Sequence, residues 1–342
     1  PALVEDVIAG CVTQVGEQGF NIGRVGALLA GFPVEVSGTT VNRQCGSSQQ
    51  AFHFAAQAIM AGQADCVIAA GVESMSRVAM GSDALAQPSW FPPSTGYKYK
   101  FVMQHESAEM VAEKWGISRR QCEELALRSH QLAAAAVEQG RFKAEIVPID
   151  VAQADGVVRA FEVDEGVRPG STLEKMATLA PVVKPDGVVT AATSSQISDG
   201  ASAIVVMSAE KAKALGIRPL ARVVAMTAVG VEPTMMLHGP IPATKKALAR
   251  AGLRLDDIGL VEINEAFAVV VLAWQKEMGL LDLDRVNVNG GAMALGHPLG
   301  ASGCRLLATL VHEMARRGVR YGLSTMCIGF GQATATILDR HV

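Results

Sequence analysis

Cys45 stands where a predicted strand gives way to a predicted helix, a place that favours a reactive thiol. Residues 39–42 are short and β-prone, and the Gly-Ser-Ser of residues 46–48 can open a helix. Unpaired amides and the helix dipole favour negative charge there, so they lower a thiol pKa and raise the population of the attacking thiolate. The polar neighbours Asn42 and Arg43 fit a simple packing role poorly. We therefore expect Cys45 to be a nucleophile.

The other cysteines fall into two groups. Four lie in apolar or helical patterns, which is typical of buried, unreactive thiols; they are Cys11, Cys66, Cys122 and Cys304. Cys327 instead ends an apolar strand and precedes Ile328 and Gly329, where a glycine lets a backbone amide approach a pocket closely. Because no cysteine forms a C-x-x-C pair or stands at zinc spacing from a histidine, the sequence predicts neither a metal site nor a disulfide framework.

A thiol nucleophile needs a base, and His297 is the candidate. It lies in the glycine-rich stretch 290–303 and is followed by Pro298, an arrangement that packing explains poorly. Four other histidines sit in helical patterns or at the tail, where surface or packing roles suffice: His53, His130, His312 and His341. Asn264 follows the apolar segment 260–263 and is interpretable either as a site residue or as a simple helix cap. These positions lie at strand ends, where open α/β sheets place their sites.

The elements that would position these residues alternate in type. Residues 49–61 have helical spacing, and residues 66–70 form a short apolar strand of the buried, parallel kind. A capping box opens a helix over 118–140, residues 141–190 are loop-rich, and the rhythm resumes at 201–207. This alternation predicts an α/β fold.

The sequence also contains a faint internal repeat. Strand-like residues 41–42, a glycine-bearing turn, a helix and an apolar strand form one unit. Strand-like residues 286–289, a glycine-rich turn, a helix over 302–317 and a strand over 321–327 form a second. Each unit carries a reactive residue at its turn, so we expect a duplicated fold with the site between its halves.

Aromatic residues crowd into the Pro/Ser/Gly-rich segment 82–105. They are Trp90, Phe91, Tyr97, Tyr99 and Phe101. Two interpretations stay open: the rings anchor an irregular excursion or a subunit contact, or they form a lid over an apolar substrate tail.

Composition limits the function classes. The 342 residues are 49% apolar and 18% charged, with a formal net charge of −3 and no block of like charge. Nucleic-acid binding and attachment to an anionic membrane surface are therefore not expected, and no apolar run approaches the ~18 residues of a membrane span. No signal peptide is visible after Pro1, so we expect a cytoplasmic protein.

Four blocks of the sequence resemble, in order, the active-site blocks of the thiolase family. They are residues 42–48, 264–267, 296–303 and 327–329, and two further segments, 73–76 and 198–201, also match. The resemblance spans nearly the whole chain. It implies a thiolase fold, an α/β architecture of two similar halves in a layered α-β-α-β-α arrangement. The domain limits we expect are 1–80 and 198–218 for the first half, 81–197 for an inserted loop domain and 219–342 for the second half.

The resemblance also implies the role of each site residue. Cys45 would accept the acyl group after His297 deprotonates it, and Cys327 would act as acid and base at the substrate α-carbon. One oxyanion site would use His297 and a water held by Asn264, and a second would use the backbone amides of Cys45 and Gly329. Deprotonation next to a thioester produces an enolate, so both a base and oxyanion donors are required.

The implied reaction is the CoA-dependent cleavage of 3-ketoacyl-CoA to acetyl-CoA and a shortened acyl-CoA, or the reverse Claisen condensation. The first cysteine block is more similar to degradative members, such as those of fatty-acid β-oxidation. Coenzyme A would be a substrate, with no other cofactor, and a homodimer or homotetramer is expected. Ser195 would contact its pantetheine arm, and Arg168 would lie near its nucleotide or be a solvated loop residue. Two alternatives are a ketoacyl-synthase-type condensing enzyme and a non-catalytic thiolase-like protein that binds acyl-CoA or lipid.

Three features depart from the family pattern. Phe330 occupies a position where many members have glycine, and its ring could narrow the pocket. Residues 103–106 (Met-Gln-His-Glu) stand one residue out of register with the His-Met pair of some short-chain members. The chain also begins inside the usual family start, so a first strand and helix are expected to be missing.

Overall fold

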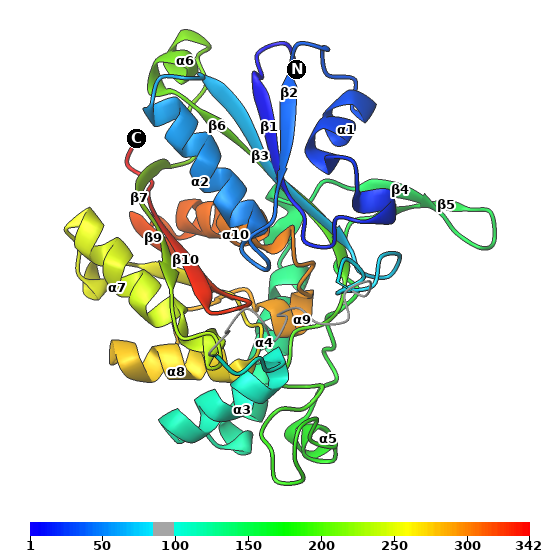
Figure 1. Cartoon of the computed structure of the whole chain (residues 1–342), viewed down its shortest axis with the longest axis vertical. Coiled ribbons are helices and arrows are strands. Elements are labelled where there is room, and N and C mark those ends of the chain that lie inside the picture. Colours follow the sequence, from blue (N-terminus) through cyan, green and yellow to red (C-terminus); the bar gives the residue numbers. More distant parts are fainter. Residues whose placement is uncertain (85–98) are drawn as a thin grey trace.

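The computed structural model describes residues 1–84 and 99–342 and contains two four-stranded sheets (Figure 1). In the first sheet, β1 pairs in parallel with both β2 and β3, and β6 pairs antiparallel with β3. Its strands, in spatial order, are β2 (Ser37–Val41), β1 (Asp6–Gly10), β3 (Cys66–Ser74) and β6 (Asp199–Met207).

The second sheet repeats this pattern. β8 pairs in parallel with β9, and β10 pairs antiparallel with β9 and with β7. Its order is β7 (Arg222–Gly230), β10 (Gln332–Asp339), β9 (Tyr321–Ile328) and β8 (Leu260–Ile263). Each sheet therefore contains three neighbouring strands of which the first two pair antiparallel and the last two pair in parallel. They are β6, β3 and β1 in the first sheet and β10, β9 and β8 in the second. The prediction of two similar halves is confirmed.

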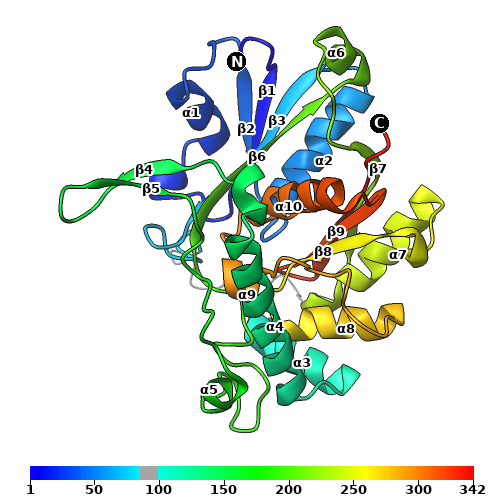
Figure 2. The same ribbon diagram turned by 180° about the vertical axis from the view of Figure 1, so that it is seen from behind.

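Helices fill the space between the sheets and cover their outer faces (Figures 1 and 2). α2 (Ser47–Met60) and α10 (Ser302–Arg317) contact each other in the middle, and α10 touches β8 and β9 on one side and β3 and β6 on the other. α1 (Ile22–Leu29) packs on the first sheet, and α6 (Ala209–Ala214) follows β6. α7 (Pro240–Ala251) packs on the second sheet and contacts α8 (Ala268–Met278). The layers are those predicted.

The chain leaves the first sheet after β3 and returns at β6. Between them lie α3 (Gln104–Trp115), α4 (Arg119–Glu138), α5 (Leu173–Ala177) and the hairpin of β4 (Ile149–Ala152) and β5 (Val158–Phe161), which extends as an arm in Figure 1. Ser118 and Gln121 form the predicted capping box of α4. α3 packs on α8, and α4 packs on α8 and on α9 (Ala292–Leu295). Short 3₁₀ turns occur at Gly16–Gln18, Arg141–Ala144, Met236–His238 and Leu255–Asp257. This path supports the domain limits that we propose from the sequence.

One sequence prediction needs correction. Residues 286–289 do not form a strand; Val286 and Val288 make only isolated bridges. The reason is Asn287, which has a left-handed backbone (φ 46°) and whose side chain bonds both the N–H and the carbonyl of Ile263 at 2.8 Å. The region 141–190 is loop-rich, as expected, with the β4–β5 hairpin and α5 as its short regular elements. Of the aromatic cluster, Trp90, Phe91 and Tyr97 lie outside the described residues, so its two interpretations stay untested.

Candidate active site

Cys45 lies in a tight turn between β2 and α2, and its side chain is only 3% exposed. The preceding residue, Gln44, has a left-handed backbone with φ of 46°. Two hydrogen bonds hold this turn: the Gln44 N–H donates to Asn42 Oδ1 (2.8 Å), and the Arg43 N–H donates to Ser47 Oγ (2.9 Å). A non-glycine residue persists in such a conformation only where its surroundings enforce it. The turn therefore fixes Cys45 just before the start of α2, as predicted.

The end of β9 approaches this turn closely because residue 46 is glycine. A Cβ on Gly46 would lie 2.3 Å from Cδ1 of Ile328, so any side chain there would displace the side chain of Ile328. Cys45 packs with Ile328, Leu299 and Leu306 in one buried cluster. The end of β9, the His297 loop and α10 thus meet at the thiol.

Cys327 and Gly329 bring the end of β9 into the site. Complete burial raises the pKa of the Cys45 thiol, whereas the Gly329 N–H, the Gln104 side chain and the N–H of Cys45 itself act in the opposite direction as hydrogen-bond donors. Burial, and then the nearby Cys45, raise the pKa of the Cys327 thiol. The Cys45 thiol acts on the ionisation of Cys327, so the two lie in one site. Both are protonated at rest, and the lowered Cys45 pKa predicted from the helix start is wrong, because burial outweighs the hydrogen-bond donors.

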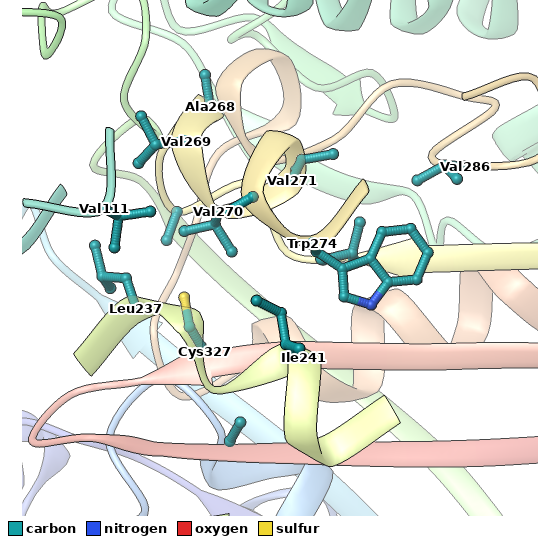
Figure 3. Packing of buried hydrophobic residues seen from close by; sticks show 14 of the residues in the cluster. Val111, Leu237, Ile241, Ala268, Val269, Val270, Val271, Trp274, Val286 and Cys327 are labelled. Carbon is teal, nitrogen blue, oxygen red and sulfur yellow. The ribbon is translucent and has the colours of Figure 1, made fainter. Parts of the chain in front are cut away.

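The surroundings of Cys327 explain its high pKa. Figure 3 shows it among the apolar side chains of the largest buried cluster, with Leu237 and Ile241 close by. Val270 and Trp274 of α8 belong to the same cluster. A thiolate gains no solvation from such side chains, so this thiol holds its proton firmly.

His297 is buried and has a partner on each ring nitrogen. Its Nδ1 lies 2.5 Å from Ser302 Oγ, and its Nε2 lies 3.3 Å from Asn264 Nδ2. The Ser302 hydroxyl donates to the Pro298 carbonyl (2.9 Å), so it accepts from Nδ1–H and leaves the lone pair on Nε2. Burial, with a smaller contribution from the positive charge of Arg305, lowers the pKa of His297 to about 3. The imidazole is therefore neutral near pH 7 and able to take up a proton at Nε2.

Asn264 is not a helix cap. α8 begins at Ala268 with Phe267 as its cap residue, and the Asn264 side chain turns instead toward His297. Its backbone N–H donates to the Thr325 carbonyl at 3.1 Å, which ties it to β9. The Oδ1 atom is buried and, among the described residues, has no hydrogen-bond partner. A buried amide oxygen in this state is suited to hold a water molecule in the site.

Glu73 joins the two halves behind the site. Its carboxylate accepts from the N–H groups of Val12 (2.9 Å), Thr13 (3.0 Å) and Gly300 (2.8 Å) and from Gln18 Nε2 (3.0 Å). The residue is 1% exposed and lies near the end of β3. It fixes the loop that carries His297. Sequence reasoning assigns it no role, although a glutamate in an otherwise apolar strand is a usable signal.

Glu265 is a second buried carboxylate, also without a role assigned from the sequence. It accepts from Ser129 Oγ (2.7 Å), Asn287 Nδ2 (3.0 Å) and the Met293 N–H (3.2 Å). Burial raises its pKa. Through these bonds it links the Asn264 segment to α4 and to α9.

Ser195 and Arg168 lie at the edge of this arrangement. The Ser195 N–H donates to the Ala266 carbonyl (3.0 Å), so the segment runs beside Asn264, and the His297 N–H donates to the Gln196 carbonyl (3.0 Å). Arg168 is exposed, and its backbone N–H donates to His130 Nδ1 at 3.1 Å. The structure thus brings Ser195 next to the central residues and leaves the Arg168 side chain at the surface.

Phe330 follows Gly329 with a left-handed backbone (φ 61°). Its ring lies 5.7 Å from the ring of Phe101, which belongs to the aromatic segment before α3. Such a pair contributes about 1 kcal/mol, which offsets the roughly 1 kcal/mol that a non-glycine residue costs in this conformation. The effect of Phe330 on the width of the pocket stays a prediction.

Within residues 1–84 and 99–342, no group of three or more His, Cys, Asp or Glu side chains could hold a metal ion. None of the helices in these ranges is long and apolar enough to cross a membrane. All six cysteines are free and buried.

Comparison with known proteins identifies the class. Residues 1–210 match the family model of the thiolase N-terminal domain, and residues 217–340 match that of the thiolase C-terminal domain. A 3-ketoacyl-CoA thiolase of Vibrio cholerae is 50% identical over 99% of this chain and 88% of its own. One of Marinomonas sp. is 50% identical over 98% and 86%.

Two solved structures share the fold. The Bacillus anthracis acetyl-CoA acetyltransferase has a TM-score of 0.89 and 40% identity over 98% of this chain and 87% of its own. Human mitochondrial 3-ketoacyl-CoA thiolase has a TM-score of 0.89 and 39% identity over 99% and 88%. Fold and sequence together define an acyltransferase. The chain belongs to the thiolase family, as its motifs predict, and not to the ketoacyl-synthase group.

Proposed function

We propose that the chain catalyses the CoA-dependent cleavage of 3-ketoacyl-CoA to acetyl-CoA and a shortened acyl-CoA, and the reverse Claisen condensation, through an acyl-Cys45 intermediate. Coenzyme A is then a substrate, and no further cofactor is needed. The main support is that the buried thiols of Cys45 and Cys327 interact, and that the loop of the neutral His297 joins the buried cluster of Cys45 through Leu299. Relatives at 50% identity carry the name of this activity.

In the first half-reaction, His297 Nε2 takes the proton of Cys45 as the sulfur attacks the 3-keto carbon. Since both pKa values oppose this transfer, the attraction between thiolate and imidazolium and the donors at the sulfur must offset its cost. The bond between the α- and β-carbons then breaks and leaves the acyl group on Cys45. The electron pair goes to the acetyl-CoA enolate, whose α-carbon takes the Cys327 proton. A thiol held protonated by apolar surroundings is a suitable acid for this step.

The negative oxygens need donors at two places. On the Cys45 side we propose the N–H groups of Cys45 and Gly329, because hydrogen bonding by both acts to lower the pKa of the Cys45 thiol. On the enolate side we propose the protonated His297 and a water held by Asn264, whose buried Oδ1 supports this role. Each such donor typically lowers the barrier by about 3 kcal/mol.

In the second half-reaction, free coenzyme A enters and gives its thiol proton to the Cys327 thiolate. Its sulfur attacks the acyl-Cys45 carbonyl, the Cys45 sulfur leaves, and His297 returns the proton to it. Every proton and bond in the two half-reactions is thereby accounted for, and both cysteines end as thiols.

The coenzyme A contacts complete the proposal. Ser195 contacts the pantetheine arm, supported by its pairing with the Ala266 carbonyl beside Asn264. Arg168 contacts the nucleotide, supported by its exposed position within the insertion. We further propose a cytoplasmic homodimer or homotetramer.

A turnover assay tests the function. The chain is incubated with free coenzyme A and with acetoacetyl-CoA or longer 3-ketoacyl-CoAs, and loss of the ketoacyl thioester is followed. We expect cleavage of at least one chain length, with two acetyl-CoA formed per acetoacetyl-CoA lost, or one acetyl-CoA and one shortened acyl-CoA per longer 3-ketoacyl-CoA lost. An absence of turnover at every chain length would contradict the proposal and leave the alternative of a protein that binds acyl-CoA or lipid without turnover.

A further inference from the structure

Gln104 is a further residue of the site, and it comes from α3, which none of the sequence motifs includes. It is the first residue of α3 and is partly buried. The start of this helix is fixed because the Met103 N–H donates to Glu106 Oε2 at 2.7 Å. The Gln104 side chain is therefore presented by a helix of twelve residues rather than by a loose loop.

The carboxamide of Gln104 stands over both Gly329 and Cys45. Its Nε2 lies 3.4 Å from the position that a Cβ on Gly329 would take, and Gln44 Cγ lies 3.6 Å from the same point. Gly329 is therefore flanked by two glutamine side chains, both within ordinary van der Waals contact of that position. Hydrogen bonding by the Gln104 side chain also acts to lower the pKa of the Cys45 thiol, so the carboxamide faces that thiol.

The charges around Cys45 make a neutral donor important. The charged residue that acts on its thiol is Glu73, and that carboxylate raises the thiol pKa, as burial does. Only hydrogen bonds oppose these effects, and they come from Gly329, Gln104 and the N–H of Cys45 itself. Of the three, Gln104 alone is a side chain, so it can be removed by substitution without changing the backbone.

We propose that Gln104 is a catalytic residue: its Nε2–H donates to the Cys45 sulfur in the free enzyme and to the negative oxygen that forms on the carbon attached to Cys45. It is thus a third donor beside the N–H groups of Cys45 and Gly329. This inference rests on the proposed function, because it requires Cys45 to be the acyl acceptor. A purely structural glutamine at the start of α3 would not influence the ionisation of a cysteine in another element.

The test compares wild type with Gln104→Met, which keeps the length and loses the donor, and Gln104→Glu, which keeps the shape and adds charge. Gln63→Met, on an exposed turn after α2, is the matched control. Alkylation of Cys45 by iodoacetamide is measured from pH 6 to 10 by peptide mass spectrometry, and acylation by acetoacetyl-CoA by rapid quench. We expect Gln104→Met to shift the alkylation profile to higher pH and to slow acylation on the order of a hundredfold, with little change in KM. Gln104→Glu shifts the profile further, and Gln63→Met matches wild type.

The outcomes separate this inference from the proposed function. If wild-type Cys45 forms no acyl-enzyme, the proposed function fails and this inference fails with it. If wild-type Cys45 is acylated and either Gln104 variant keeps the wild-type pH profile and acylation rate, Gln104 is not a donor, although the proposed function stands. Gln104→Glu keeps the test decisive if Gln104→Met folds poorly, because a glutamate at the start of a helix is stabilising.

Discussion

The two halves of the fold deliver their reactive residues at comparable places but by different means. In the first half, residues 42–46 connect β2 directly to α2, and bonds among neighbours in this turn hold Cys45. In the second half, α9 and an irregular loop precede α10, and distant residues hold His297. Glu73 from the first sheet binds Gly300, and Gln196 from the segment before β6 binds the His297 N–H.

This contrast separates the roles of local and long-range structure. The position of the nucleophile is encoded in its own turn, whereas the position of the base depends on contacts made only after the halves have packed together. Substitutions in the Cys45 turn should therefore act through chemistry at Cys45. Substitutions of the distant supports should act through the base while leaving the thiol in place.

The largest effect is expected from Cys45→Ala. Without the sulfur no acyl-enzyme can form, so turnover should fall by roughly 10⁴-fold or more. Intact-mass spectrometry after mixing with acetoacetyl-CoA should show an added acetyl group on the wild type and none on the variant. Cys66→Ala removes another buried thiol, at the start of β3, and should retain the acetyl adduct. An adduct on Cys45→Ala would place the acyl acceptor elsewhere.

Cys327→Ala tests the acid and base role proposed for the second cysteine of the site. Cys45 should still be acylated by an activated acetyl thioester, because its own donors are intact. Exchange of the α-protons of acetyl-CoA in D₂O should fall on the order of 10³-fold, since the acid and base at carbon is lost. Proton NMR of acetyl-CoA measures this exchange. Rapid exchange by the variant would remove the role assigned to Cys327.

Glu73→Gln tests whether the base depends on long-range support. In this variant the NH₂ of the amide would face N–H groups that donate to a carboxylate in the wild type. We expect this mismatch to lower the free energy of unfolding by about 3 kcal/mol. Turnover should fall while the rate of Cys45 alkylation does not, because the His297 loop shifts, the Cys45 turn stays in place, and the charge that raises the Cys45 pKa is removed. Chemical denaturation and iodoacetamide labelling measure the two effects.

The control for this variant is Glu17→Gln, which alters a surface carboxylate paired with Arg77 and should leave both rates unchanged. Equal losses of turnover and of Cys45 reactivity in Glu73→Gln would show that Glu73 supports the whole site and not the base in particular.

The same contrast explains what the sequence could predict. The Cys45 turn, the Ser118 capping box and the bounds 302–317 of α10 follow from signals within a few residues, and all were predictable. The four motif blocks identify the family because their order is specific. The contacts that Glu73 and Gln104 make in the site were not predictable, because each acts on residues far away in the chain. Residues 286–289 looked like a strand, but the left-handed Asn287 prevents regular pairing.

The smallest expected effect concerns a second buried histidine, which serves packing rather than chemistry. His53 of α2 lies 2.7 Å from Thr336 Oγ1 of β10 and so links the two halves. Burial, with the charge of Arg43, lowers its pKa to about 3. The unfolded chain binds a proton near pH 6.5 whereas the folded protein does not, so stability is lost as the pH falls from about 6.5 toward 3.

His53→Gln should remove this contribution while the amide keeps a bond to Thr336. Between pH 7 and pH 5 the wild type should lose about 2 kcal/mol through this group, and the variant should not. Urea denaturation at both pH values measures the difference, and turnover at pH 7 should stay within about twofold of wild type if the residue only packs. The pKa of His297 is equally low, so His297 also makes stability fall in acid. His53→Gln should therefore reduce, but not abolish, the dependence of stability on pH. An unchanged slope would mean that His53 is protonated in the folded protein, and a large loss of turnover would mean that the joint between α2 and β10 controls the site itself.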